Sequence, residues 1–311
     1  MKLATYARNN TDRVGVVVGD QIYDLADCIT AGEKGDPATA ASTLAFLASG
    51  PSAVESAQKA VAWAQARGGK DLALPIHEVR LRAPIPDPGK LLCLAGNYAD
   101  HILEGSGRLQ FSGKDKMIPR FFLKPHTVIV GPGDAIRIPP STTWVDWELE
   151  LAVVIGQPGR DIPVEEASQY IGGYTIFNDI SARELAFRQH LPKQSGDDFF
   201  DWLVGKWLDT FGPMGPWLTT ADQVPQPDRL SVRLWLNDEL QQDGNTGQMI
   251  FSPAEAIAFI SQFVTLQPGD LISTGTPAGV GLAKKIRLKP GDQIRGEIAG
   301  LGVLENPVQA L

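Results

Sequence analysis

The stretch "DWELELAVVIG", residues 146–156, decides the fold because it carries a line of acids into an apolar run with no turn between them. Alternate residues of a β-strand point to opposite faces, so Asp146, Glu148 and Glu150 share one face. That acidic face itself turns apolar after Glu150, whereas a strand with one wet side keeps polar residues along it. The pattern therefore predicts a buried strand whose acids line a pocket; the alternative is a solvated strand end.

The composition favours a protein that acts on small molecules. The chain has 311 residues, 43% of them hydrophobic, and a formal net charge of -8 without a long basic run, which argues against nucleic acid or an anionic membrane as the main partner. Cys28 and Cys93 lie far apart, so neither a disulfide framework nor a thiolate zinc site is indicated. The N-terminal residues lack a signal-peptide pattern, and we expect a cytoplasmic protein.

Proline and glycine punctuation predicts two domains. "APIPDPGK", residues 83–90, suits neither a helix nor a central strand, and it separates a small α+β domain, residues 1–82, from a larger, mainly β domain, residues 83–311. In the larger domain three Pro-Gly-Asp turns have the chemistry of type II turns. A helix is predicted within residues 252–266, where Ser252 can cap and a proline follows.

A third acid can complete a metal site with the two glutamates. Asp179 ends a second β-like run, and the Ser-Ala that follows it can begin a helix. Neighbouring carboxylates repel, so either one of them is protonated or a cation lies between them. Carboxylate oxygens from Glu148, Glu150 and Asp179 suit Mg²⁺ or Mn²⁺ better than Zn²⁺ and leave coordination positions for water or substrate. The alternative for Asp179 is a helix N-cap.

"GNYADHILEG", residues 96–105, offers a candidate general base. His101 and Glu104 lie at i and i+3 on a short helical turn, so they can touch. A carboxylate beside an imidazole orients it and raises its basicity, which makes a pair able to take a proton near neutral pH. The alternative is an ordinary surface ion pair. The segment that follows, residues 106–120, is typical of a mobile loop and is a candidate lid, in which Arg108, Lys114 and Arg120 would influence specificity.

Two lysines and a glycine-rich loop are further candidates. Lys124 and Lys206 each lie between apolar neighbours and can supply positive charge to an oxyanion or a substrate carboxylate, or simply reach the surface. "STGTPAGVG", residues 273–281, has the glycine content of an anion-binding nest, or of a tight turn. The loop matches neither a phosphate-binding nor a dinucleotide-binding fingerprint.

Taken in order, six of these stretches resemble the fumarylacetoacetate hydrolase family over roughly residues 84–308. They are "NYADHILE", "FFLKP", "VDWELELAVVIG", "FNDISARE", "GKWLDTFGPMGPW" and "STGTPAGVG". The resemblance implies a mixed β-sandwich or roll with flanking helices, often dimeric, that holds one Mg²⁺ or Mn²⁺ per subunit. It assigns the metal to Glu148, Glu150 and Asp179, and catalysis to His101, Glu104 and Lys206. It assigns substrate contacts to Tyr98, Lys124, Arg183, Gly275 and Thr276.

The resemblance also implies an activity. We expect hydrolysis of a carbon–carbon bond in a β-diketo acid of the acylpyruvate type, through an enolate that the metal stabilises. The alternatives are an oxaloacetate-type decarboxylase, a 2-hydroxymuconate-type isomerase, or a non-catalytic module that binds metal or small acids.

One departure from the family pattern affects the substrate assignment. Many members follow Ser/Thr-Ala-Arg with Asp-x-Gln, whereas this chain has Glu184 and Ala186. The segment 186–205 is long and aromatic and can shape the pocket or a dimer contact.

Overall fold

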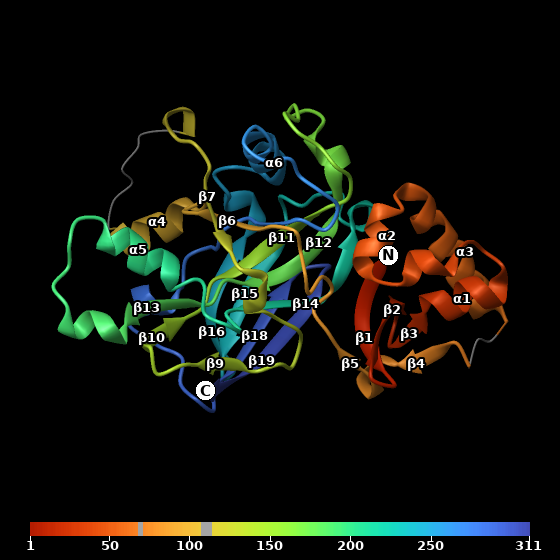
Figure 1. Ribbon diagram of the computed structural model, residues 1–311, viewed down its shortest axis with the longest axis horizontal. Helices are drawn as coiled ribbons and strands as arrows, with labels where there is room; N and C mark the ends of the chain where they lie inside the picture. The colour runs from red at the N-terminus through yellow and green to blue at the C-terminus, as the bar shows by residue number, and fades with distance from the viewer. Residues whose placement is uncertain (68–70, 107–113) are drawn as a thin grey trace.

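The computed structural model describes residues 1–67, 71–106 and 114–311, and its fold is α+β with many strands. A long mixed sheet runs through the molecule in the order β4-β3-β2-β1-β14-β12-β11-β17-β6-β7 (Figure 1). The last six strands in this order are β14 (Gly212–Thr220), β12 (Ile171–Asn178), β11 (Leu149–Ile155), β17 (Leu271–Ser273), β6 (Leu91–Ala95) and β7 (Arg120–Lys124). A smaller sheet contains β16 (Glu239–Asn245), β15 (Ser231–Leu236), β18 (Gln293–Ile298), β19 (Gly302–Ala310) and β9 (Ile136–Ile138). A separate pair joins β10 (Thr142–Asp146) to β13 (Ser181–Leu185).

Strand β11 is buried on both faces, which explains why its sequence does not keep a wet side. Leu149, Leu151 and Val153 belong to the core shared with the smaller sheet. Ala152 and Val154, on the opposite face, belong to a second core that includes the N-terminal helices. Glu148 and Glu150 therefore lie at the end of a strand whose acidic face continues into this second core, as the sequence pattern predicts, and the solvated-strand alternative is wrong.

The N-terminal residues form a small α+β unit that extends the long sheet. Its strands are β1 (Lys2–Arg8), β2 (Thr11–Val18), β3 (Gln21–Asp24) and β4 (Ala73–Pro75), and its helices are α1 (Leu25–Gly32), α2 (Thr43–Ala48) and α3 (Pro51–Ala66). Strand β1 pairs antiparallel with β14, so the sheet crosses the expected boundary without a break. The division into domains 1–82 and 83–311 stays a prediction.

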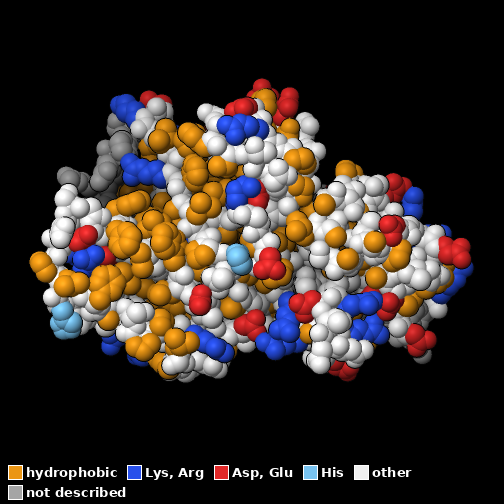
Figure 2. All heavy atoms as spheres, viewed as in Figure 1, with side chains coloured by type: hydrophobic (Ala, Val, Ile, Leu, Met, Phe, Trp, Pro, Cys, Tyr) orange, Lys and Arg blue, Asp and Glu red, His pale blue; other side chains and the backbone are white. Residues whose placement is uncertain are grey.

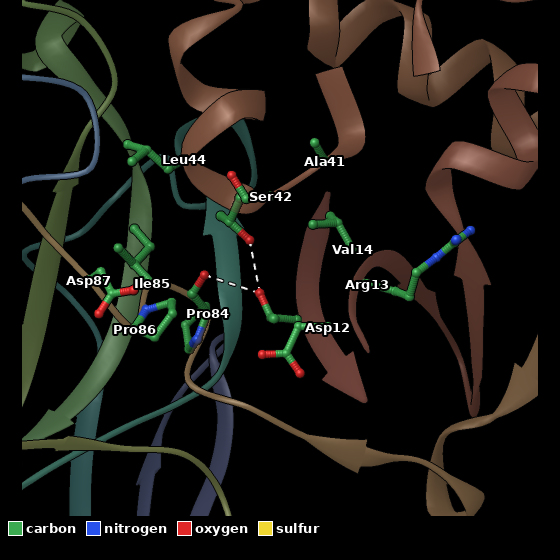
Figure 3. A pocket seen from close by; sticks show the side chains of 12 residues that line it. Asp12, Arg13, Val14, Ala41, Ser42, Leu44, Pro84, Ile85, Pro86 and Asp87 are labelled. Carbon is green, nitrogen blue, oxygen red and sulfur yellow. Dashed lines mark hydrogen bonds between the residues drawn. The ribbon is translucent and has the colours of Figure 1, made fainter. Parts of the chain in front are cut away.

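The linker around residues 83–90 packs against this unit. The Thr5 hydroxyl donates to the carbonyl of Pro84 (3.2 Å) and lies 3.1 Å from the Thr43 hydroxyl. Beside them is a cavity of about 160 Å³, which Figure 3 shows between Asp12 and Ser42 on one side and Pro84 on the other. These contacts add to the continuous sheet in joining the two parts of the chain.

Asp24 holds the N-terminal unit together, and we expect Asp24→Ala to lower the free energy of unfolding by about 2–4 kcal/mol. The buried carboxylate accepts hydrogen bonds from the Tyr6 hydroxyl and from two nitrogens of Arg13. As the N-cap of α1, it also accepts from the backbone N–H of Asp27. Thermal and urea unfolding would measure the loss. The matched control is Asp36→Ala, which removes the exposed cap of a short 3₁₀ turn.

The same variant tests whether the N-terminal unit unfolds as an independent domain. A continuous sheet predicts one unfolding transition in the variant, and a separate low-temperature transition would instead indicate an independent N-terminal domain.

Burial alone would raise the pKa of Asp24, but hydrogen bonds from Arg13 and Tyr6 hold it below its ordinary value. Its stabilisation is therefore complete above the unfolded-state pKa and is lost as the pH falls through the lower folded-state pKa.

Several local predictions meet the structure directly. Helix α6 (Pro253–Ser261) begins after Ser252, which forms a capping box with Glu255. The glycines of the three Pro-Gly-Asp turns, Gly133, Gly269 and Gly291, have φ of 76°, 85° and 97°, as type II turns require. The expectation of a helix after Asp179 is wrong, because Ser181–Leu185 pairs with β10 as strand β13. None of the helices in the described residues is both long and apolar enough to cross a membrane.

Candidate active site

The three predicted metal ligands converge. Glu150 lies in β11, Glu148 directly precedes that strand, and Asp179 directly follows β12, which pairs with β11 in a register that sets Leu149 opposite Asn178. One carboxylate oxygen from each acid lies within 4.8 Å of the others, and all three side chains are buried. Backbone bonds fix the junction, since the Asp179 N–H donates to the Glu148 carbonyl (2.8 Å). No helix begins at Asp179, so the N-cap alternative is wrong.

Buried cations surround the trio. Lys206 Nζ donates to Glu148 Oε2 (2.9 Å) and Asp179 Oδ2 (2.8 Å). Lys124 donates to Asp179 and to the carbonyls of Ile180 and Phe211. Both lysine side chains are buried, so the alternative in which they reach the surface is wrong.

Arg183 and Asp146 complete this charged cluster. Arg183 links Glu148 to Asp146, with 2.6 Å between its Nε and Asp146 Oδ1. Residues 147 and 148 lie between β10 and β11, outside both strands, so the alternation of a single strand is interrupted there. Asp146 instead accepts hydrogen bonds from Arg183 and from the backbone N–H of Leu282 (2.6 Å). Asp146 therefore does not share the metal cluster, although simple alternation placed it on the same face.

The charges leave one carboxylate uncompensated. Burial raises the pKa of Glu150 well above its ordinary value, and the negative charges of Asp179 and Glu148 raise it further. Burial alone would raise the pKa of Glu148 too, but the positive charges of Lys206 and Arg183 hold it below its ordinary value. Burial alone would lower the pKa of Lys206, yet Asp179 and Glu148 keep it above its ordinary value, so the lysine stays charged at neutral pH.

The donor set fits a hard divalent cation. The four acids of this cluster (Asp146, Glu148, Glu150 and Asp179) face three cations (Lys124, Arg183 and Lys206), which leaves one excess negative charge among these groups. Removing charges from water is costly unless they are paired. Oxygen ligands without histidine or cysteine suit Mg²⁺ or Mn²⁺. Glu148, Glu150 and Asp179 are thus the residues that would hold such an ion.

The predicted imidazole–carboxylate pair forms on helix α4 (Ala99–Ser106). His101 Nδ1 lies 2.9 Å from Glu104 Oε1, and the side chains are only 21% and 17% exposed, so the surface-pair alternative does not describe them. The loop of residues 273–281 places this pair beside the acidic trio, because it also contacts Glu150 through the Gly275 N–H. The other oxygen of Glu104 accepts the N–H of Gly279 (2.8 Å). The geometry leaves Nε2 of His101 as the nitrogen that can face a substrate.

The glycine-rich loop binds carboxylates of the protein itself. The Gly275 N–H donates to Glu150 Oε2 (2.8 Å), and the Ser273 hydroxyl donates to the same oxygen. The Thr276 hydroxyl donates to the Leu149 carbonyl (2.9 Å) and accepts from Gln242 (2.8 Å). Ser273 and Gln242 were not expected from the sequence, because ligand-supporting hydroxyls and amides have no spacing signal of their own.

Tyr98 and the segment 106–120 complete the list of expected site residues. The Tyr98 hydroxyl is buried and has no hydrogen-bond partner in the part of the chain that the structure describes. Burial raises the pKa of this phenol, as does the nearby charge of Glu150. Lys114 pairs with Glu255 at the start of α6 (2.7 Å). Arg108 lies outside the described residues, and the lid expected at residues 106–120 stays a prediction.

Comparisons with known proteins identify the family of this chain. The model of the fumarylacetoacetate (FAA) hydrolase C-terminal family matches residues 90–309. The mitochondrial oxaloacetate tautomerase Fahd2a of Rattus norvegicus is 41% identical over 275 residues, which cover 88% of this chain and 81% of that protein. A crystal structure of maleylpyruvate hydrolase from Sphingobium sp. SYK-6 with manganese(II) and pyruvate has a TM-score of 0.75 and 31% identity, covering 100% of this chain and 99% of that chain.

A third relative carries another activity on the same fold. The crystal structure of 2-hydroxyhepta-2,4-diene-1,7-dioate isomerase from Mycobacterium marinum has a TM-score of 0.72 and 30% identity, covering 100% of this chain and 98% of that chain. The family match spans most of the chain, and the relatives include a hydrolase, an isomerase and a tautomerase. With its strand-rich α+β fold and buried acidic trio, this chain belongs to the fumarylacetoacetate hydrolase family.

Proposed function

We propose that this protein is a divalent-metal enzyme that interconverts the keto and enol forms of a 2-oxo acid of the oxaloacetate type. The observation that carries the proposal is the His101–Glu104 pair beside a buried acidic trio. Such an interconversion needs one proton carrier and one electrophile; His101 would be the carrier, and a divalent ion held by Glu148, Glu150 and Asp179 would be the electrophile. The identity of 41% with an oxaloacetate tautomerase supports this substrate class.

The residues have separate tasks in this mechanism. A bound Mg²⁺ or Mn²⁺, one per subunit, would act as a Lewis acid that polarises the 2-oxo group. His101 removes a proton from carbon 3 of the keto form, and a proton is delivered to the 2-oxo oxygen, which gives the enol; in the reverse direction the oxygen loses its proton and His101 returns one to carbon 3. Glu104 orients the imidazole through Nδ1. Lys206 supplies fixed positive charge near the oxygen on which negative charge develops.

Hydrolysis of a carbon–carbon bond in an acylpyruvate is the second candidate. The specific observation in its favour is the 31% identity over the full chain with a maleylpyruvate hydrolase whose structure contains manganese and pyruvate. In this reaction His101 would take a proton from water, and the water oxygen would attack the distal carbonyl. The bond between carbons 3 and 4 then breaks, and carbon 3 receives the proton, which yields pyruvate and a carboxylic acid.

A substrate panel separates these functions. Oxaloacetate enol decay, decarboxylation of oxaloacetate and pyruvate release from acylpyruvates are measured with Mg²⁺, with Mn²⁺ and with EDTA. Metal-dependent acceleration of enol decay, above any cleavage of acylpyruvates, is the expected result. Faster release of pyruvate from acylpyruvates would instead show that the protein is a hydrolase. The absence of metal-dependent turnover of any oxo acid would favour a non-catalytic binding module. The substrate named for the isomerase relative, 2-hydroxyhepta-2,4-diene-1,7-dioate, completes the panel.

We also propose that two copies of the chain associate through an exposed aromatic surface. It consists of Phe187, Leu191, Phe199, Phe200 and Trp207, which are 38–66% exposed. Figure 2 shows hydrophobic side chains gathered on this face, where Figure 1 places α5 (Asp197–Val204). Monomeric soluble proteins rarely expose a large contiguous apolar patch, and aromatic residues dominate the binding energy of interfaces.

Replacing Phe199 and Phe200 together by serine should weaken this dimer by about 100-fold or more. Light scattering after size exclusion, over a range of protein concentrations, measures the mass. The control is Phe263→Ser, which alters an aromatic side chain that is 57% exposed and packs against α6 residue Phe259. A double variant with the same mass profile as the wild type would contradict this interface.

A further inference from the structure

We propose that Trp147 and Gly279 are positioning residues that hold the His101–Glu104 pair at a fixed place relative to the metal-ligating acids. The proposal rests on the proposed function in one respect, which is that His101 carries the proton. Neither residue touches the substrate in this assignment. Both act through Glu104.

Gly279 is bonded to both halves of the site. Its N–H donates to Glu104 Oε2 (2.8 Å), and its carbonyl accepts from the Trp147 indole Nε1 (3.2 Å). Trp147 directly precedes Glu148 in the sequence. Gly279 therefore connects Trp147, next to the acidic strand, to the carboxylate that orients His101.

The loop that carries Gly279 has little freedom to move. Gly279 has φ of +106°, and a Cβ there would lie 2.2 Å from the Gln241 carbonyl oxygen. Three residues further along, the Leu282 N–H donates to Asp146 Oδ2 (2.6 Å), and Asp146 directly precedes Trp147 in the sequence. A Cβ on Gly281 would lie 2.6 Å from the Asp146 Cβ. Residues 279–282 are thus clamped onto the segment that contains Trp147.

Helix α4 depends on such contacts for its position. It has eight residues, and an isolated helix of that length is not stable in water. Glu104 ties it to the loop through the N–H groups of Gly279 (2.8 Å) and Val280 (3.5 Å). Small errors in the placement of a base reduce the rate strongly even when binding is intact. A change in Trp147 should therefore appear in kcat and not in binding.

The test is Trp147→Phe, which removes the indole N–H. The matched control is Trp217→Phe, because the buried Nε1 of Trp217 has no hydrogen-bond partner among the residues the structure describes. We expect hydrogen exchange at the Gly279 amide to rise about tenfold in metal-free Trp147→Phe. We expect kcat on oxaloacetate enol to fall about tenfold, while KM and the Mn²⁺ dissociation constant change by less than about twofold. The control should behave as the wild type in all four measurements.

Other outcomes overturn the proposal. Exchange and kcat like those of the control would show that Trp147 only fills space, and so would a loss confined to KM or Mn²⁺ affinity. If the phenylalanine variant does not fold, 3-benzothienylalanine at position 147 keeps the ring volume and removes the donor, and the same results are required of it. If the wild-type enzyme turns over no oxo acid, the proposed function fails, and the exchange measurement still decides whether the Trp147–Gly279 connection exists.

Discussion

Glu150→Gln should abolish metal-dependent activity while leaving the metal-free protein at least as stable as the wild type. Glu150 is the acid whose pKa burial raises most plainly, with Asp179 and Glu148 adding to the rise, so its charge is the uncompensated one. Glutamine keeps the shape and removes that charge. Its amide oxygen can accept the bonds that Ser273 and Gly275 now give to Glu150 Oε2.

The expected sizes follow from the ligand role. Mn²⁺ affinity should fall by more than about 100-fold, since even supporting residues around a metal contribute about 10–100-fold. Turnover should fall by about 1,000-fold or more, because the electrophile is lost. Calorimetric titration with Mn²⁺ and thermal unfolding of EDTA-treated protein measure the two effects.

A matched variant separates the site from general charge effects. Glu239→Gln removes one exposed carboxylate at the start of β16 and should leave affinity, turnover and melting temperature unchanged. A Glu150→Gln enzyme that binds Mn²⁺ normally would exclude this residue as a ligand. A strong drop in metal-free stability would show that its charge is compensated within the protein.

The convergence of the three acids could be predicted because its signal is local. Alternation in "DWELELAVVIG" and an acid at the end of the next β-like run suggested the trio, and the order of six motifs assigned it. The structure brings the three acids within 4.8 Å because β11 and β12 are paired neighbours. The His101–Glu104 contact was likewise predictable, since i and i+3 residues of a helix meet.

The supporting contacts could not be predicted, because they depend on long-range packing. Alternation predicts that Asp146 lies with the glutamates, but strand pairing is interrupted before Leu149, and Asp146 pairs with Arg183 instead. The glycine content of the loop predicts a site for an anion, and in the structure its N–H groups at Gly275 and Gly279 donate to Glu150 and Glu104. Each of these partners lies more than 100 residues from the loop in sequence, a separation across which residue spacing says nothing.

His101→Asn should reduce turnover by about 100- to 10,000-fold, the usual contribution of a positioned acid–base group. Asparagine retains a polar side chain that can bond to Glu104 but cannot carry a proton. Mn²⁺ binding should be unchanged, because the ligand set of Glu148, Glu150 and Asp179 is intact. Steady-state kinetics and Mn²⁺ titration of the same preparation measure both quantities. His126→Asn, an exposed histidine on a short 3₁₀ turn, is the control.

Glu104→Gln then distinguishes the reactions that the site can support. In hydrolysis the imidazole must hold the proton of an attacking water while charge develops on the ring, so loss of the orienting carboxylate should remove most of the rate. In decarboxylation no water is activated, and much of the rate should survive. Tautomerisation lies between them, since His101 still exchanges a proton with carbon 3 but is held less firmly. Substantial acylpyruvate cleavage by Glu104→Gln would contradict the role assigned to the pair, and full activity of His101→Asn on every oxo acid would remove the imidazole from the mechanism altogether.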